Sequence, residues 1–125
     1  MNITQAAKCT ELSPHTLRYY EKIGLLLNIA KNKSGHRDYT DADIEWIGFL
    51  KKLKATGMSI NNMKTFALLR AKGDSSIPER IKLLKQHQKI VEEKLAEIKN
   101  NLKNIKDKLV FYSNKEKELA IPKKT

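Results

Sequence analysis

Apolar residues recur at alternating steps of four and three along the C-terminal half of the chain. The residues between them are mostly Lys, Glu, Asn and Gln. This spacing is typical of a coiled coil, because the apolar stripe is wide enough for only one partner helix. The positions of this apolar seam are Ile77, Ile81, Leu84, Gln88, Val91, Leu95, Ile98, Leu102, Ile105, Leu109 and Tyr112. We expect a second copy of the chain to supply the partner helix.

Two further features bear on this helix. Ser76 and Glu79 predict a capping box, with Pro78 in the first turn, where its missing N–H costs nothing. Gln88 is the polar exception in the seam, and it either fixes the register of pairing or lies exposed near the helix start. A helix lying on an anionic membrane would need a broader apolar face than this one.

The N-terminal pattern predicts two short helices joined by a tight turn. Ile3 and the alanines that follow it share one face of the first helix. Ser13 and Pro14 then supply an N-cap and a first-turn proline for the second helix, which ends before Gly24. The second helix is crowded with Arg, Tyr, His and Lys, which favours a helix-turn-helix whose second helix enters a DNA groove.

The segment after Gly24 predicts a small hairpin and then two helices. Residues 31–37 form a basic turn, as in the wing of a winged helix-turn-helix. Thr40 and Asp43 predict a capping box for a helix that ends at Gly57, and Ser59 caps the next helix. The expected fold is mainly α, with a winged helix-turn-helix domain over residues 1–73, a dimerisation coiled coil over 76–112 and a flexible basic tail over 113–125.

Composition narrows the classes of function. The formal net charge of +11, from 25 Lys and Arg against 14 Asp and Glu, favours a polyanionic partner such as nucleic acid. Cys9 is the single cysteine, so no disulfide within the chain is possible, and a cytoplasmic location is expected. The N-terminus has no signal-peptide pattern. The sequence shows no catalytic set and no Gly-rich phosphate loop, so we expect neither an enzyme nor a cofactor or metal site.

Three runs of residues carry a more specific signal. They are Ser13-Pro14-His15-Thr16-Leu17-Arg18-Tyr19-Tyr20-Glu21-Lys22-Ile23-Gly24-Leu25-Leu26, Gly35-His36-Arg37-Asp38-Tyr39 and Gly57-Met58-Ser59-Ile60. In order and spacing this sequence resembles the MerR family of bacterial transcription regulators. The resemblance implies a homodimer with an antiparallel coiled coil that binds a pseudo-palindromic promoter. It also implies that the protein bends and untwists the promoter spacer so that RNA polymerase can engage it.

The candidate DNA-binding residues are polar or aromatic groups on the second helix and the hairpin. Arg18 can grip a phosphate or read a guanine edge, and tyrosines offer a hydroxyl to phosphate. Tyr19 and Tyr20 point about 100° apart on a helix, so we expect one of them to pack inward. For Arg37 the competing interpretation is an ion pair with Asp38 or Asp41. The full set is Ser13, His15, Thr16, Arg18, Tyr19, Tyr20, Lys22, Lys31, Lys33, His36, Arg37 and Tyr39.

The signal to which the protein responds is poorly defined by the sequence. Its length resembles that of a small subgroup linked to aldehyde and thiol stress, whose members often place a cysteine in the helix after the wing. Lys51 and Lys52 occupy that region here. Cys9 is expected to be a small buried residue. The alternative function is a non-specific basic architectural or coiled-coil scaffold protein.

Overall fold

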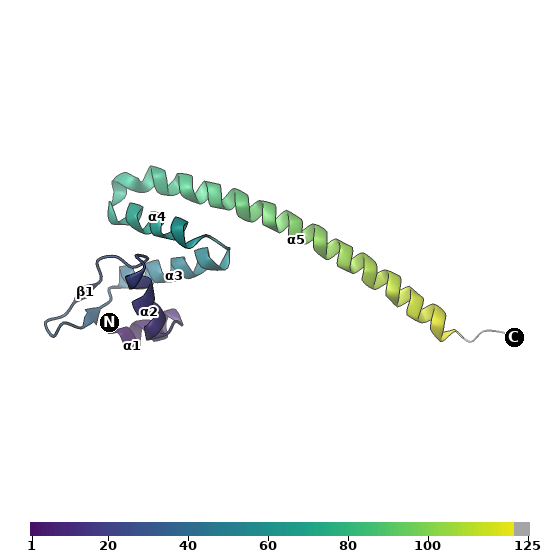
Figure 1. The fold of residues 1–125 in the computed structure, drawn as a ribbon, viewed down its shortest axis with the longest axis horizontal. Coiled ribbons are helices and arrows are strands. Elements are labelled where there is room, and N and C mark those ends of the chain that lie inside the picture. The colour runs from purple at the N-terminus through teal and green to yellow at the C-terminus, as the bar shows by residue number, and fades with distance from the viewer. Residues whose placement is uncertain (122–125) are drawn as a thin grey trace. The chain divides into compact units, whose positions relative to one another are not determined.

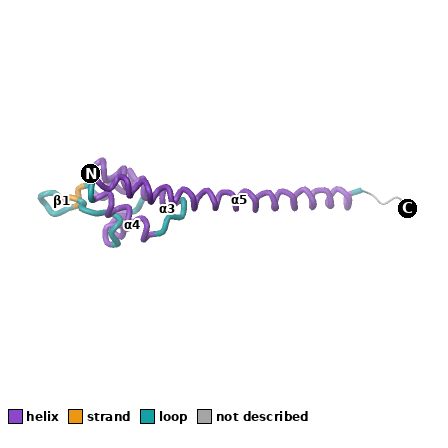
Figure 2. Tube along the Cα trace, turned by 90° about the horizontal axis from the view of Figure 1, so that it is seen from above, coloured by secondary structure: helices purple, strands orange, loops and turns teal. Residues whose placement is uncertain are grey.

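The computed structural model describes residues 1–121 and contains six helical elements and two short strands in that range. Figure 1 follows them along the chain, and Figure 2 shows that strand is confined to one small hairpin. The elements are α1 (Ile3–Thr10), α2 (Pro14–Lys22), β1 (Ala30–Lys31), β2 (Arg37–Asp38), α3 (Asp41–Ala55), α4 (Ile60–Ala71), the 3-10 turn η1 (Asp74–Ser76) and α5 (Ile77–Ala120). The expected mainly α fold with a two-stranded wing is confirmed.

Local signals explain where the first helices begin and end. Asn2 caps α1 in a capping box with Gln5, which the sequence analysis missed. Ser13 caps α2 by accepting a hydrogen bond from the Thr16 N–H at 3.0 Å, with Pro14 in the first turn, as predicted. Glu11 adopts a left-handed conformation at φ 57° after α1, and this turns the chain sharply into α2.

The later helices follow their predicted caps. Thr40 and Asp43 form the expected capping box at the start of α3, and Ser59 caps α4. Ser76 does not cap α5: its hydroxyl instead donates back to the carbonyls of Leu69 and Gly73. The predicted capping box with Glu79 is therefore wrong, because η1 directs the Ser76 side chain toward α4 rather than toward the first turn of α5.

The hairpin is held by its turn. Strands β1 and β2 pair antiparallel, with Ala30 opposite Asp38 and Lys31 opposite Arg37. The Asn32 side chain accepts hydrogen bonds from the backbone N–H groups of Ser34 and His36, both at 3.0 Å. Gly35 has φ +78°, a left-handed conformation that costs glycine little. The turn is therefore closed by its own backbone and one amide side chain.

A single core holds α1 to α4 together. Helix α1 packs on α2 and α3, and α3 packs on α4. Trp46 and Phe66 stack at 5.5 Å between ring centroids, and the Trp46 indole donates to the Leu25 carbonyl at 2.9 Å. The buried residues are Ala6, Ala7, Leu17, Tyr20, Leu25, Leu26, Tyr39, Trp46, Ile47, Leu50, Leu53, Met58, Met63, Phe66 and Ala67.

The chain forms two compact units, Met1–His87 and a second one that starts at Gln88. The first, called the N-terminal unit below, therefore includes the first turns of α5. Leu83 and Leu84 are partly buried against its core, so Leu84, predicted as a seam residue, also belongs to this core. The His87 Nε2 and Thr56 Oγ1 lie 2.8 Å apart, and this contact links α5 to the end of α3.

Helix α5 continues past the predicted end of the coiled coil. The sequence analysis expected a flexible tail from residue 113, but α5 extends to Ala120. The expectation is wrong for residues 113–120, because Lys, Glu, Leu and Ala dominate this stretch and favour helix, with no proline before Pro122. Residues 122–125 of the predicted tail lie outside the described residues. None of the helices described is both long enough and apolar enough to cross a membrane.

Candidate nucleic-acid interface

The predicted DNA-binding residues divide into an exposed group and a buried group. The exposed members come from α2, its N-cap and the wing: Ser13, His15, Arg18, Tyr19, Lys22, Lys31, Lys33 and His36. Thr16 and Arg37 are half-buried, while Tyr20 and Tyr39 are buried. Most of the predicted set is therefore accessible to a large partner.

The adjacent tyrosines on α2 separate as expected. Tyr19 keeps 47% of its surface exposed, whereas Tyr20 keeps 6% and lies in the core. The Lys54 ammonium lies 5.9 Å from the centre of the Tyr20 ring. Tyr20 is therefore a core residue, and its predicted role as a DNA contact is wrong: the helical turn that exposes Tyr19 directs its neighbour inward.

Tyr39 is also a core residue. Its exposed fraction is 2%, and its hydroxyl is buried without a hydrogen-bond partner among the described residues. Burial is the main cause that raises the pKa of Tyr39 above 10.0, and the negative charge of Glu21 adds to the shift. Of the two roles considered for this residue, a plug between wing and helix fits the burial, and a phenol that contacts phosphate does not.

Arg37 forms an ion pair inside the N-terminal unit. Its Nε donates to Glu21 Oε2 at 2.5 Å, and both side chains are partly buried. The sequence analysis considered Asp38 and Asp41 as partners, and Glu21 was not foreseen, because it lies sixteen residues away in the chain. Asp38 instead accepts a hydrogen bond from the N-terminal ammonium at 3.0 Å. The Arg37 pair joins the base of the wing to α2.

A hollow of about 420 Å³ lies where α1, α2 and the wing meet. Arg18 from α2 and His36 with Arg37 from the wing line it. Asn2, Ile3 and Thr4 at the start of α1 line it too, and the sequence analysis did not select them. Their signal was the Asn2 cap, because the first N–H groups of a helix attract anions. The hollow thus combines cationic side chains with a helix start, a surface suited to a phosphate backbone.

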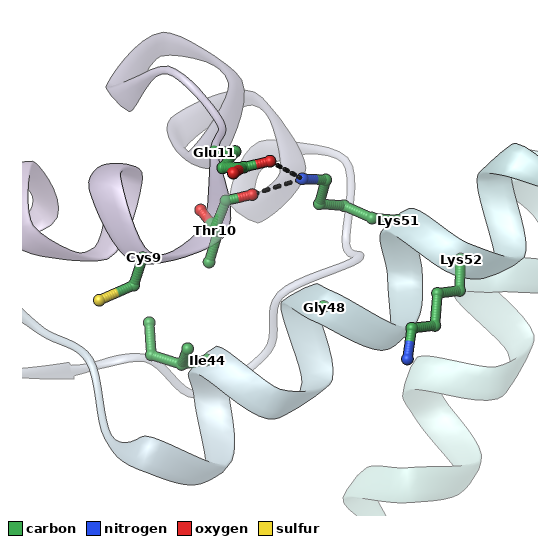
Figure 3. Close-up of a pocket in the computed structure, with 7 residues that line it drawn as sticks. All are labelled: Cys9, Thr10, Glu11, Ile44, Gly48, Lys51 and Lys52. Atoms are coloured by element: carbon green, nitrogen blue, oxygen red, sulfur yellow. Dashed lines mark hydrogen bonds and ion pairs between the residues drawn. The ribbon is translucent and has the colours of Figure 1, made fainter.

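Cys9 lies away from this surface. It is exposed rather than buried as predicted, because α1 turns its sulfur outward. Together with Ile44 and Gly48 it lines a separate hollow of about 270 Å³ between α1 and α3. Figure 3 shows the sulfur directed away from Lys51, whose ammonium donates to the Thr10 carbonyl at 2.6 Å.

Helix α5 exposes most of the apolar seam. Ile77, Ile81, Leu95, Ile98, Leu102, Ile105, Leu109 and Tyr112 are exposed, Gln88 is exposed, and Val91 is half-buried. Leu119 continues the same alternation of four and three beyond Tyr112, with Glu116 between them. A helix-turn-helix, a basic wing and a long helix with an exposed apolar stripe together define a winged helix-turn-helix protein of the DNA-binding class.

Comparison with known protein families agrees with this class. Residues 1–68 match the MerR HTH family regulatory proteins, and residues 44–114 match the family described as MerR, DNA binding. The chain therefore belongs to the MerR family of helix-turn-helix transcription regulators.

Individual relatives cover most of the chain. An uncharacterised HTH-type transcriptional regulator from Haemophilus influenzae is 41% identical over 108 residues, which cover 86% of this chain and 80% of that protein. The HTH-type transcriptional regulator AdhR from Bacillus subtilis is 39% identical over 93 residues, 74% of this chain and 66% of that protein.

Solved structures show the same fold. HiNmlR, a MerR family regulator lacking the sensor domain and crystallised bound to promoter DNA, has a TM-score of 0.81 and 38% identity, over 92% of this chain and 91% of that one. A MerR family regulator from Listeria monocytogenes has a TM-score of 0.88 and 28% identity, over 95% and 93% of the two chains.

Proposed function

We propose that this chain is a homodimeric, sequence-specific transcription regulator that acts in the cytoplasm on a pseudo-palindromic promoter. The observation that carries the proposal is the grouping of Arg18, His36 and Arg37 around one hollow beside the start of α1. A phosphate held there would fix the N-terminal unit on the DNA backbone. The exposed face of α2 would then enter the adjacent major groove.

Within this proposal the residues divide between positioning and reading the DNA. Lys22, Lys31 and Lys33 are exposed and supply positive charge to the phosphates. The Ser13 hydroxyl is already used as the cap of α2, so its contribution to DNA binding is the positioning of the helix. Arg18 and the exposed Tyr19 are the side chains on α2 best placed to reach a base edge or a sugar.

The seam of α5 supplies the dimer in this proposal. Its exposed apolar side chains would remain in water in a single chain, and pairing with a second copy buries them. The helix has 44 residues, a contour of about 66 Å at 1.5 Å per residue. An antiparallel pair would hold two N-terminal units at its opposite ends, far enough apart to contact half-sites separated by a helical turn or more.

The proposed mechanism is a change of DNA shape. Two units held by one coiled coil would bend and untwist the promoter spacer, so that RNA polymerase engages both of its recognition elements. Bending a site of this size costs about 1–6 kcal/mol, which the phosphate contacts of two units can offset.

Selection of bound DNA from a random pool tests the sequence specificity. We expect an inverted repeat to be enriched, and we expect binding to that repeat to survive competition by unrelated DNA at moderate salt. The alternative function, a non-specific basic architectural protein, predicts no enriched sequence and an equal loss of affinity for all sequences as salt rises.

A further inference from the structure

The outer surface of α5 near its C-terminal end carries two large apolar side chains outside the seam. Val110 and Phe111 are 61% and 54% exposed. The Phe111 ring meets the edge of Tyr112 at 5.2 Å between centroids, and the Lys108 ammonium lies 5.3 Å from the Phe111 ring centre. Large apolar groups on a helix that is otherwise charged outside its seam indicate a contact surface.

Heptad positions show that these two residues lie on different sides of the seam. With Ile81 and Leu84 as the a and d positions of the seam, Phe111 is a c position and Val110 a b position. Positions c and g share one side of the helix, whereas b and e share the other. Phe111 thus shares its side of α5 with Leu83, also a c position, and with His87, a g position.

The N-terminal unit packs against that same c and g side. Leu83 is partly buried against its core, and His87 contacts Thr56 at the end of α3 at 2.8 Å. Arg80, another g position, donates through Nη2 to the Gly73 carbonyl at 2.7 Å. The first turns of α5 are therefore flanked by their own N-terminal unit on the side that carries c and g residues.

An antiparallel pairing brings the two observations together. Reversing one helix of a pair places the g positions of both helices on the same side of the seam. If the seam pairs about its own middle, Tyr112 lies alongside the partner's Ile81, at the level where the N-terminal unit flanks α5. The c and g side of the C-terminal end then faces that unit, whereas the b and e side faces solvent.

We propose that Phe111 docks on the N-terminal unit of the second copy, beside the first turns of that copy's α5. This inference rests on the homodimer proposed above. It makes the C-terminal end of each α5 a direct link between the coiled coil of one chain and the DNA-binding unit of the other. In a parallel pair, by contrast, the two Phe111 rings would lie at the same level, far along both helices from the N-terminal units.

Site-specific photocrosslinking on the full chain tests this contact. The variant Phe111→p-benzoylphenylalanine would be mixed with an isotopically labelled parent chain, irradiated, and digested for mass spectrometry. We expect crosslinks from position 111 of one copy to peptides within residues 1–87 of the other. The same substitution at Val110 is the matched control, because it is equally exposed in one chain but lies on the opposite side of the seam, and we expect few such crosslinks from it.

A second measurement compares Phe111→Ala with Val110→Ala by sedimentation equilibrium. We expect Phe111→Ala to weaken dimerisation about tenfold or more, as for a buried aromatic anchor, and Val110→Ala to leave it within about twofold. A parent chain that is dimeric but gives crosslinks only within residues 88–121, or equal crosslinks from both positions, would overturn this inference alone. A monomeric parent chain would overturn the proposed homodimer as well.

Discussion

The Arg37 guanidinium donates through Nε to Glu21 Oε2 at 2.5 Å and so ties the wing to α2. The two side chains are 33% and 25% exposed, between the surface pairs that add little stability and the buried pairs that are costly to break. We predict that Arg37→Ala lowers the free energy of unfolding by about 1–2 kcal/mol and weakens promoter binding, as measured by chemical denaturation and by fluorescence anisotropy.

Glu21→Gln is the matched control for this pair. It keeps a hydrogen-bond acceptor for Arg37 but removes the negative charge, so we expect a smaller loss of stability and no loss of DNA affinity. An Arg37→Ala variant with parental stability and parental affinity would contradict the role assigned to this contact.

Arg18 is exposed on α2 and lines the hollow shared with the wing. We predict that Arg18→Ala weakens promoter binding by about 1–3 kcal/mol if the side chain reads a base, or lowers the salt dependence by about one phosphate contact if it grips the backbone. Anisotropy titrations at several salt concentrations distinguish the two results. The control Lys82→Ala removes an exposed charge from α5, outside the proposed DNA-binding face, and parental affinity in Arg18→Ala would contradict the proposed interface.

Tyr39 gives a pH dependence of known sign. Burial raises its pKa above 10.0, the ordinary value that it regains on unfolding, so the folded state holds its proton to higher pH. The stability linked to this proton is fully present below pH 10.0 and is lost as the pH rises through the folded pKa. We predict that Tyr39→Phe loses less stability than the parent above pH 10.0, as measured by denaturation across that range.

The same variant tests the unpaired hydroxyl. A buried hydroxyl without a partner costs about 1–3 kcal/mol, so at neutral pH we expect Tyr39→Phe to be as stable as the parent chain or about 1 kcal/mol more stable. Promoter affinity should not change. A loss of affinity with intact folding would instead show that the phenol reaches DNA.

Leu102 lies in the seam and is exposed in the single chain. We predict that Leu102→Glu produces a folded monomer, because a charge in the seam opposes pairing but touches nothing in the N-terminal unit. Sedimentation equilibrium gives the oligomeric state, and circular dichroism reports the fold. Lys103→Glu places the same new charge on the next residue, outside the seam, and should remain dimeric; dimers in both variants would contradict the assigned seam.

The sequence predicted the elements whose signals are local. Ser13 with Pro14 and Thr40 with Asp43 mark helix starts through hydrogen bonds within one turn, and the structure has both. The wing was likewise predictable, because its closing residues are neighbours in the chain. Ser76 misled the prediction, because its hydroxyl is used by a carbonyl of the preceding helix rather than by the first turn of α5.

Contacts between distant residues were beyond reach of the pattern. Glu21 and Arg37 belong to different elements, and only the fold brings them together. Tyr20 and Tyr39 have the composition of DNA-binding residues, but the packing of α2 and the wing buries them. The seam predicted the contact face of α5 but not its end, since helix propensity rather than apolar spacing carries the helix from Ser113 to Ala120.

Hydroxyl-radical footprinting on a selected promoter tests the central claim most directly. If two N-terminal units held by one coiled coil bind and distort the DNA, the footprint will show two protected half-sites on one face of the duplex and altered cleavage at the centre between them. Protection of a single half-site, with normal cleavage at the centre, would contradict this account.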